Sequence, residues 1–228
     1  MYKIKHLLFL LSFFISCVAF SQAVNDAGLW VSVNVEKKLN KRTEFFVTQA
    51  YRRNENLTQT NLFYTDIGMS VKPFGFMKVS LSYRSIQKYA KEEVFNFRHR
   101  VTMDVLFKKK INNVTLSFRE RLQMQVQEIN TSETGKIPEW STRPKMEFKY
   151  DLDKPIAPFV SAEFRYQFQN RKEAELGHSW NRTRYVAGFD YKINKRNSCA
   201  LYYVVQNSFN VPDPENTYTV GVLYTVSL

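Results

Sequence analysis

Glycine, proline and cysteine are scarce in this sequence, which has 7 Gly, 7 Pro and 2 Cys among 228 residues. The low glycine and proline content argues against a disordered chain and against a glycine-rich phosphate-binding fold. The sequence has no Cys/His cluster with metal-ligand spacing, and it contains no calcium-loop or phosphate-loop motif. We therefore expect neither a metal nor another cofactor.

Long apolar runs are also missing, except at the N-terminus. There, Lys3 and Lys5 precede an apolar run over residues 7–20, and Ala19-Phe20-Ser21 forms a small-x-small cleavage site. This three-part pattern predicts a cleaved signal peptide over residues 1–21, because the apolar run is short for a membrane-spanning helix. The protein is therefore expected to be exported.

The two cysteines are Cys17 and Cys199. Cys17 lies inside the predicted signal peptide, where a lipoprotein anchor is an alternative, although Phe14 fits the usual lipobox poorly. Cleavage leaves Cys199 as the only cysteine, so the mature chain cannot form an intramolecular disulfide.

The chain is basic and rich in aromatic residues. It has 33 Lys+Arg against 21 Asp+Glu, and 15% of its residues are aromatic. Removal of residues 1–21 leaves a net charge of +10. This composition is also typical of proteins that bind nucleic acids, but an exported chain does not meet them, so we expect no nucleic-acid partner.

Residues 94–107 alternate strictly between two kinds of side chain. One side carries Phe95, Phe97, His99, Val101, Met103, Val105 and Phe107, and the other carries Asn96, Arg98, Arg100, Thr102, Asp104 and Leu106. A period of two predicts a β-strand with one apolar and one charged face. The same alternation recurs within residues 30–36, 63–72, 77–84, 114–126, 145–150, 160–168, 184–193 and 217–228. Segments 43–53 and 198–208 alternate less regularly, and the pattern does not indicate which of their residues face inward.

These segments amount to about 11 strands of roughly nine to thirteen residues, the length that a tilted strand needs to cross a bilayer. Single-chain bacterial barrels normally have an even number of strands, so we expect 10–12, with ten or twelve favoured. Short connections at 37–42, 73–76, 109–112, 152–156 and 194–197 alternate with longer polar ones at 54–58, 88–93, 127–139, 170–178 and 209–216. This layout predicts an all-β protein with one domain, residues 22–228, folded as a closed antiparallel up-and-down transmembrane β-barrel.

The alternation alone does not say which face is inside, because a soluble exported β-sandwich or lipid carrier could use the same pattern. The strand length and an apolar face nearly free of charge, with His99 and Glu120 as exceptions, favour the membrane. Aromatic residues that we place near strand ends, where interfacial girdles lie, also favour it; they are Trp140, Trp180, Tyr83 and Tyr150. We therefore place Phe95, Phe97, Val101 and Phe107 against lipid, in the outer membrane of a Gram-negative bacterium.

Several short motifs resemble a known family. They are Gly28-Leu29-Trp30, Tyr83-Arg84, Phe118-Arg119-Glu120-Arg121 and Ser161-Ala162-Glu163-Phe164. In their order and spacing, over most of residues 27–228, they resemble the outer-membrane barrel family labelled domain of unknown function 2490. The resemblance implies a barrel, with outer-membrane lipids and the outer-membrane assembly machinery as partners, and it supplies no activity or functional residues. One departure is the C-terminal Leu228, where assembly signals usually end in an aromatic residue.

The lumen face is expected to carry a ladder of cations. Its members are Arg98, Arg100, Arg119, Arg121, Arg143, Lys145, Arg165, Arg182 and Arg184, with Asp66, Asp104, Glu147, Glu163 and Asp190 as potential partners. One interpretation is a pore or binding site that favours small anionic solutes. The other is an Arg–carboxylate network that plugs a narrow barrel and stiffens it.

Catalytic residues are not indicated. Only His99 and His178 remain after cleavage, and neither has a recognisable nucleophile or orienting group. The polar loop 129–139 is interpreted as a solvated cap, with binding of an external partner as the alternative. The sequence thus predicts a non-enzymatic barrel that either passes small anions or has a structural role. An outer-membrane enzyme that modifies lipid remains the rival.

Overall fold

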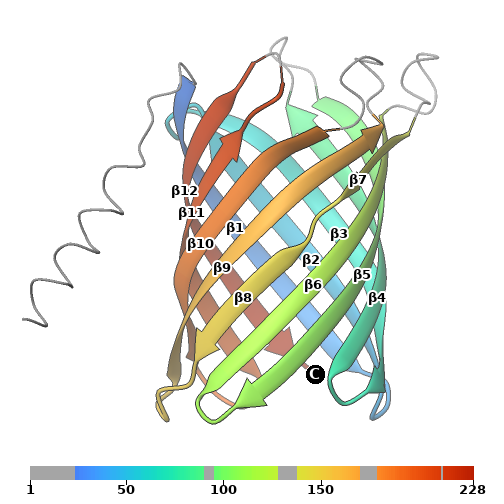
Figure 1. Cartoon of the computed structure of the whole chain (residues 1–228), viewed down its shortest axis with the longest axis vertical. Helices are drawn as coiled ribbons and strands as arrows, with labels where there is room; N and C mark the ends of the chain where they lie inside the picture. Colours follow the sequence, from blue (N-terminus) through green and yellow to red (C-terminus); the bar gives the residue numbers. More distant parts are fainter. Residues whose placement is uncertain (1–23, 90–94, 128–137, 170–178, 212) are drawn as a thin grey trace, which may run out of the picture.

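The computed structural model describes residues 24–89, 95–127, 138–169, 179–211 and 213–228, which form a β-barrel (Figure 1). The predicted signal peptide, residues 1–21, lies outside the described residues. The strands are β1 (Val24–Lys38), β2 (Thr43–Asn54), β3 (Gln59–Phe74), β4 (Met77–Tyr89), β5 (Phe95–Ile111), β6 (Val114–Gln127), β7 (Glu139–Thr142), β8 (Lys145–Tyr150), β9 (Ile156–Gln169), β10 (Ser179–Lys192), β11 (Asn197–Ser208) and β12 (Glu215–Ser227). No helix among these residues is long and apolar enough to cross a membrane.

Apart from β7 and β8, each strand pairs with its neighbours in the sequence, and the sheet closes on itself. All of these pairings are antiparallel except one, because β12 pairs with β1 in parallel, with Trp30 opposite Gly221. β7 and β8 both lie between β6 and β9, so twelve strands occupy eleven positions around the described wall. A closed barrel is confirmed, and the alternative β-sandwich is wrong.

The expected 10–12 strands are confirmed, because the sheet has twelve strands, and these occupy eleven positions around the barrel. An odd number of alternating positions places the first and last strands in the same direction, so the barrel closes with a parallel pair. The predicted strand length of nine to thirteen residues is wrong for several strands. β3 and β5 are longer, with 16 and 17 residues, and β7 and β8 are shorter, with 4 and 6.

Burial is inverted relative to a water-soluble domain. Glycine aside, four apolar and fifteen polar or charged residues are buried among the described residues. Large apolar side chains cover the outside instead, for example Leu81, which is 60% exposed, and Phe118. Apolar residues in contact with lipid and polar residues inside are the arrangement of a transmembrane barrel.

The predicted apolar face of residues 95–107 lies on this outer surface. Phe97, Val101 and Phe107 are exposed there, whereas the side chain of Phe95 lies outside the described part. The predicted position of Tyr83 near a strand end is wrong. Tyr83 lies in the middle of β4 and forms a hydrogen bond with His99 of β5. Trp140, Trp180 and Tyr150 do lie near strand ends, at the start of β7, the start of β10 and the end of β8.

The two ends of the barrel differ. One end, here called the turn side, carries the connections after β1, β3, β5, β8 and β10, and the other end, the loop side, carries those after β2, β4, β6, β9 and β11 (Figure 1). Asn112 and Asp153 adopt left-handed φ values of 50° and 57° in two of the short turns. These residue types tolerate that conformation because their short polar side chains bind the local backbone. β1 begins on the loop side and β12 ends on the turn side.

Candidate functional site

The barrel encloses a cavity of about 820 Å³ that is lined by residues of all twelve strands. Among the described residues, eleven Arg and two Lys line it, against seven Asp and Glu. The aromatic residues Trp30, Tyr64 and Tyr202 also line the cavity. Cationic charge therefore predominates in the lumen.

All nine cations of the predicted ladder line this cavity, in the order Arg98, Arg100, Arg119, Arg121, Arg143, Lys145, Arg165, Arg182 and Arg184. The predicted partners Glu147, Glu163 and Asp190 line it too. Asp104 and Asp66 share the lumen face, because they bind the inward-pointing Arg121 and Arg84. The strand period of two accounts for this common facing.

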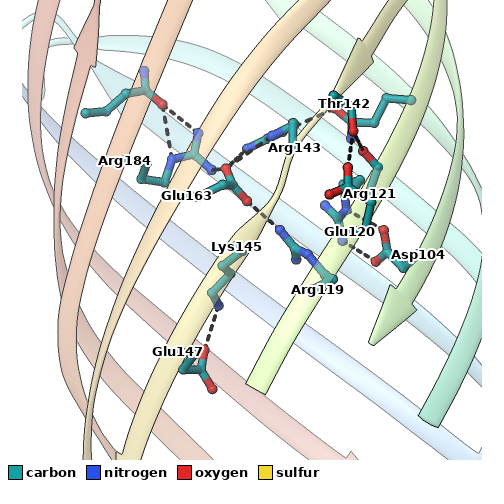
Figure 2. A network of polar contacts seen from close by, with 12 residues as sticks. Asp104, Arg119, Glu120, Arg121, Thr142, Arg143, Lys145, Glu147, Glu163 and Arg184 are labelled. Atoms are coloured by element: carbon teal, nitrogen blue, oxygen red, sulfur yellow. Dashed lines mark hydrogen bonds and ion pairs between the residues drawn. The ribbon is translucent and has the colours of Figure 1, made fainter. Parts of the chain in front are cut away.

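Glu163 of β9 is the centre of a polar network (Figure 2). Its carboxylate accepts hydrogen bonds from Arg143 Nε at 3.1 Å and from Arg184 Nη1 at 3.3 Å. Arg119 donates a further hydrogen bond from β6. One buried carboxylate, 7% exposed, is thus shared by three arginines from different parts of the wall.

Other ion pairs stiffen the middle and the turn side of the barrel. Arg121 binds Asp104 through two 2.6 Å hydrogen bonds, and Arg84 binds Asp66 at 2.6 and 3.1 Å. Three lysine–carboxylate pairs lie in the turn-side half, namely Lys78–Glu44, Lys145–Glu147 and Lys149–Asp190. Cations in these regions are largely matched by acids.

The loop-side half is different, because amides replace carboxylates as hydrogen-bond acceptors. Arg100 donates to Gln125 through Nε at 3.0 Å. Arg165 donates to Gln167 at 3.1 Å. Arg184 donates to Gln206 through Nε at 3.2 Å and Nη2 at 2.5 Å. A glutamine satisfies donors but leaves the guanidinium charge in place.

Aromatic rings hold further arginines in the lumen. The guanidinium carbon of Arg52 lies 3.9 Å from the ring centre of Trp30, and that of Arg184 lies 5.0 Å from the same ring. Arg84 stacks on Tyr64 at 4.0 Å. These cation–π contacts fix the planes of the guanidinium groups without cancelling their charge.

Sequence reasoning missed Trp30, Arg52 and the acceptor glutamines as parts of the site. In β2 the sequence does not show which residues point into the lumen. The inward face carries the apolar Phe46 and Ala50 beside Arg52, and the outward face carries the polar Gln49. In β11 both faces are largely apolar, so the two-residue alternation is weak and does not indicate which residues point inward. The stacking of Arg52 on Trp30 depends on strand register, since the two residues are cross-strand partners.

Two ionisable residues lie on the outer face, as the sequence predicts. His99 Nδ1 shares a 2.6 Å hydrogen bond with Tyr83 Oη, and Glu120 accepts one from Thr142 Oγ1. His178 and residues 128–137 of the predicted loop lie outside the described residues. Within the described part of the chain, no group of three His, Cys, Asp or Glu could hold a metal ion.

At the turn side, Lys110 Nζ donates a 2.9 Å hydrogen bond to the Asp151 carboxylate. This contact holds the pKa of Asp151 below its usual value. Both groups are exposed, so the pair has little effect on barrel stability.

Comparisons with known proteins agree with this fold. A family model described as "Protein of unknown function (DUF2490)" matches residues 27–217. A solved structure of the NanC porin is 11% identical, with a TM-score of 0.52 over 86% of this chain and 97% of that one. The β domain of the Bordetella autotransporter BrkA is 8% identical, with a TM-score of 0.47 over 79% and 82% of the two chains. A search of curated proteins finds no match.

Proposed function

Since the chain belongs to the DUF2490 family, whose description gives no activity, we propose a function from the lumen itself. The protein is a non-enzymatic outer-membrane barrel of a Gram-negative bacterium that passes small anionic solutes passively. The observation that carries this proposal is the excess of cations in the lumen, with thirteen Arg and Lys against seven Asp and Glu around the cavity. Such an excess raises the local concentration of anions in a narrow channel.

The cavity volume supports a passage rather than a fully packed interior. Barrels of about eight strands are filled by their own side chains, whereas 16- to 18-stranded porins contain an aqueous channel. This barrel, with eleven wall positions, falls between these classes and retains a cavity of about 820 Å³. The shared Glu163 network narrows it without filling it, so a small solute is the appropriate size class.

A structural role in the outer membrane is the second candidate. It is supported by the ion pairs of the middle and turn side, four of which join different strands. However, a purely structural network needs matched charges, whereas Arg100, Arg165 and Arg184 donate to neutral glutamines. Passage of anions accounts for this mismatch.

Chloride influx into liposomes tests the proposal. Purified protein is reconstituted into liposomes that contain a chloride-sensitive fluorescent dye, and folding is checked by the shift in gel migration between boiled and unboiled samples. We expect chloride influx well above that of empty liposomes, and slower influx for the Arg100→Gln/Arg182→Gln variant. Influx at the rate of empty liposomes, from protein that passes the folding check, would reject passive anion passage.

A further inference from the structure

We propose that the loop-side half of the lumen is a saturable binding site for a solute with two or more anionic groups, such as phosphates or carboxylates. The site is formed by Arg52, Arg100, Arg165, Arg182 and Arg184, here called the arginine girdle. This inference rests on the proposed function, because the ligand is a solute that the barrel would pass. It adds that passage occurs through a selective binding step.

The position of the girdle follows from the strand bounds. Arg100 lies in the first half of β5 and Arg182 and Arg184 lie in the first half of β10, and both strands start at the loop side. Arg52 and Arg165 lie in the last halves of β2 and β9, which end there. The five guanidinium groups therefore surround the lumen at a similar depth from the loop side.

Among the described residues, acids do not match the charges of the girdle. Arg100, Arg165 and Arg184 donate to Gln125, Gln167 and Gln206, which are neutral. Glu163 also accepts a bond from Arg184, but it shares its charge with Arg119 and Arg143. The carboxylates of Glu139 and Glu215 lie near Arg165 and Arg182. Within the part of the chain that the structure describes, these three acids do not neutralise the five girdle arginines and the two that share Glu163.

The girdle arginines repel one another. Arg100 lies close enough to Arg52, Arg143 and Arg165, which come from other parts of the wall, for like-charge repulsion. Arg182 likewise experiences like-charge repulsion from Arg165 and Arg143. A single negative charge relieves part of this repulsion, whereas a solute with several negative charges contacts several arginines at once. The arrangement therefore favours multivalent anions.

Two features indicate a prepared site. The Arg52 guanidinium is held against Trp30 and lies 5.4 Å from the ring centre of Tyr64, so ligand binding costs less side-chain entropy. In addition, Arg182 Nε is buried and has no hydrogen-bond partner among the described residues. A buried donor without a partner is costly, and an anionic oxygen in the lumen would satisfy it.

Fluorescence of Trp30 provides the binding test. Replacement of Trp140 and Trp180 by Phe leaves Trp30, which contacts Arg52 and Arg184, as the only tryptophan. Folded barrel is titrated in detergent with pyrophosphate or citrate, and with acetate as the monovalent control, at constant ionic strength. We expect a saturable change in emission with both multivalent anions, at concentrations at least about tenfold lower than with acetate.

Gln125→Glu and Gln206→Glu place carboxylates against Arg100 and Arg184 with almost no change in side-chain shape. Each variant is expected to weaken pyrophosphate binding by about tenfold or more, because the new carboxylate competes for the same guanidinium. Gln87→Glu, on the outer face near the loop-side end of β4, makes the same chemical change outside the lumen. This control is expected to bind as the parent does.

Conductance of single barrels in planar bilayers separates the two proposals. Anion-selective current that falls in a saturable way with added pyrophosphate supports both. Anion-selective current that pyrophosphate does not reduce, with no saturable fluorescence change, would overturn the binding site and leave anion passage standing. Saturable binding in a barrel that passes no anions would overturn the proposed passage instead. Equal pyrophosphate affinity in the parent, Gln125→Glu and Gln206→Glu would also overturn the girdle as the site.

Discussion

Arg184 and Gln206 face each other on neighbouring strands β10 and β11, joined by hydrogen bonds of 3.2 and 2.5 Å from Nε and Nη2 of the arginine to Oε1 of the glutamine. A carboxylate at this place would satisfy the same donors and neutralise the charge. The amide satisfies the donors and keeps the charge. The pair thus holds the arginine side chain in place while the lumen keeps its positive charge.

Loss of the shared carboxylate is expected to destabilise the barrel. Glu163→Gln removes the carboxylate that Arg143, Arg119 and Arg184 share, and breaking a buried ion pair costs about 3–5 kcal/mol. Glu147→Gln is the matched control, because its pair with Lys145 is more exposed and is worth about 1 kcal/mol or less. Unfolding in urea, followed by tryptophan fluorescence, measures both. Similar losses in the two variants would argue against Glu163 as the centre of the network.

Tyr202 covers Gly221 across the β11–β12 pair, and this contact can be tested through the glycine. A Cβ atom at Gly221 would lie 2.1 Å from Cε2 of the tyrosine ring. Gly221→Ala must displace the ring, so we expect a loss of about 1–3 kcal/mol in the free energy of unfolding. Gly75→Ala is the control, because a Cβ there meets no atom within 4 Å. A Gly221→Ala barrel as stable as the Gly75→Ala barrel would contradict the close contact.

Parallel closure of the barrel predicts a specific crosslink. Asn34 and Thr225 are partners in the parallel register of β1 and β12. In a Cys199→Ser background, Asn34→Cys/Thr225→Cys is expected to form an intramolecular disulfide, because neighbouring strands lie within disulfide range. Asn34→Cys/Thr219→Cys is the control, since Thr219 pairs with Gly28, further along β1. Non-reducing gel migration shows the result, and crosslinking of the control pair alone would exclude this register.

A charge on the outer face tests whether that face contacts lipid. Leu81 and Leu39 are similarly exposed, at 60% and 57%, but Leu81 lies within β4 and Leu39 lies in the turn after β1. Leu81→Arg is expected to destabilise the reconstituted barrel by up to about 2–4 kcal/mol, depending on depth, and Leu39→Arg by about 1 kcal/mol or less. Urea unfolding in phospholipid vesicles measures the difference. Equal, small effects would place Leu81 in water.

The two-residue alternation of the sequence predicts much of this fold, because successive residues of a barrel strand face lipid and the lumen in turn. β5 and β9 separate an outward apolar set from an inward charged set, so the lumen positions of Arg98, Arg100 and Arg165 follow from counting. β2 and β11 do not separate them, because Ala50 and Val204 are apolar residues packed inside the lumen. There the facing depends on the neighbouring strands rather than on local sequence.

The candidate site was predictable only in outline. The sequence indicates which residues face inward, but not which of them meet. The pairing of Arg184 with Gln206 depends on the β10–β11 register, and the stacking of Arg52 on Trp30 depends on the β1–β2 register. Turn lengths and wall closure fix those registers. The parallel closure likewise results from the whole number of strands, which no single segment encodes.

The most direct test of the basic lumen as an anion pathway is the reversal potential of the reconstituted barrel in a planar bilayer with a KCl gradient. A barrel whose cavity is lined, among the described residues, by thirteen Arg and Lys against seven Asp and Glu is expected to give a reversal potential close to the equilibrium potential of chloride. A reversal potential close to that of potassium, from barrels that conduct, would contradict the account, because the lumen cations would then not control which ions pass.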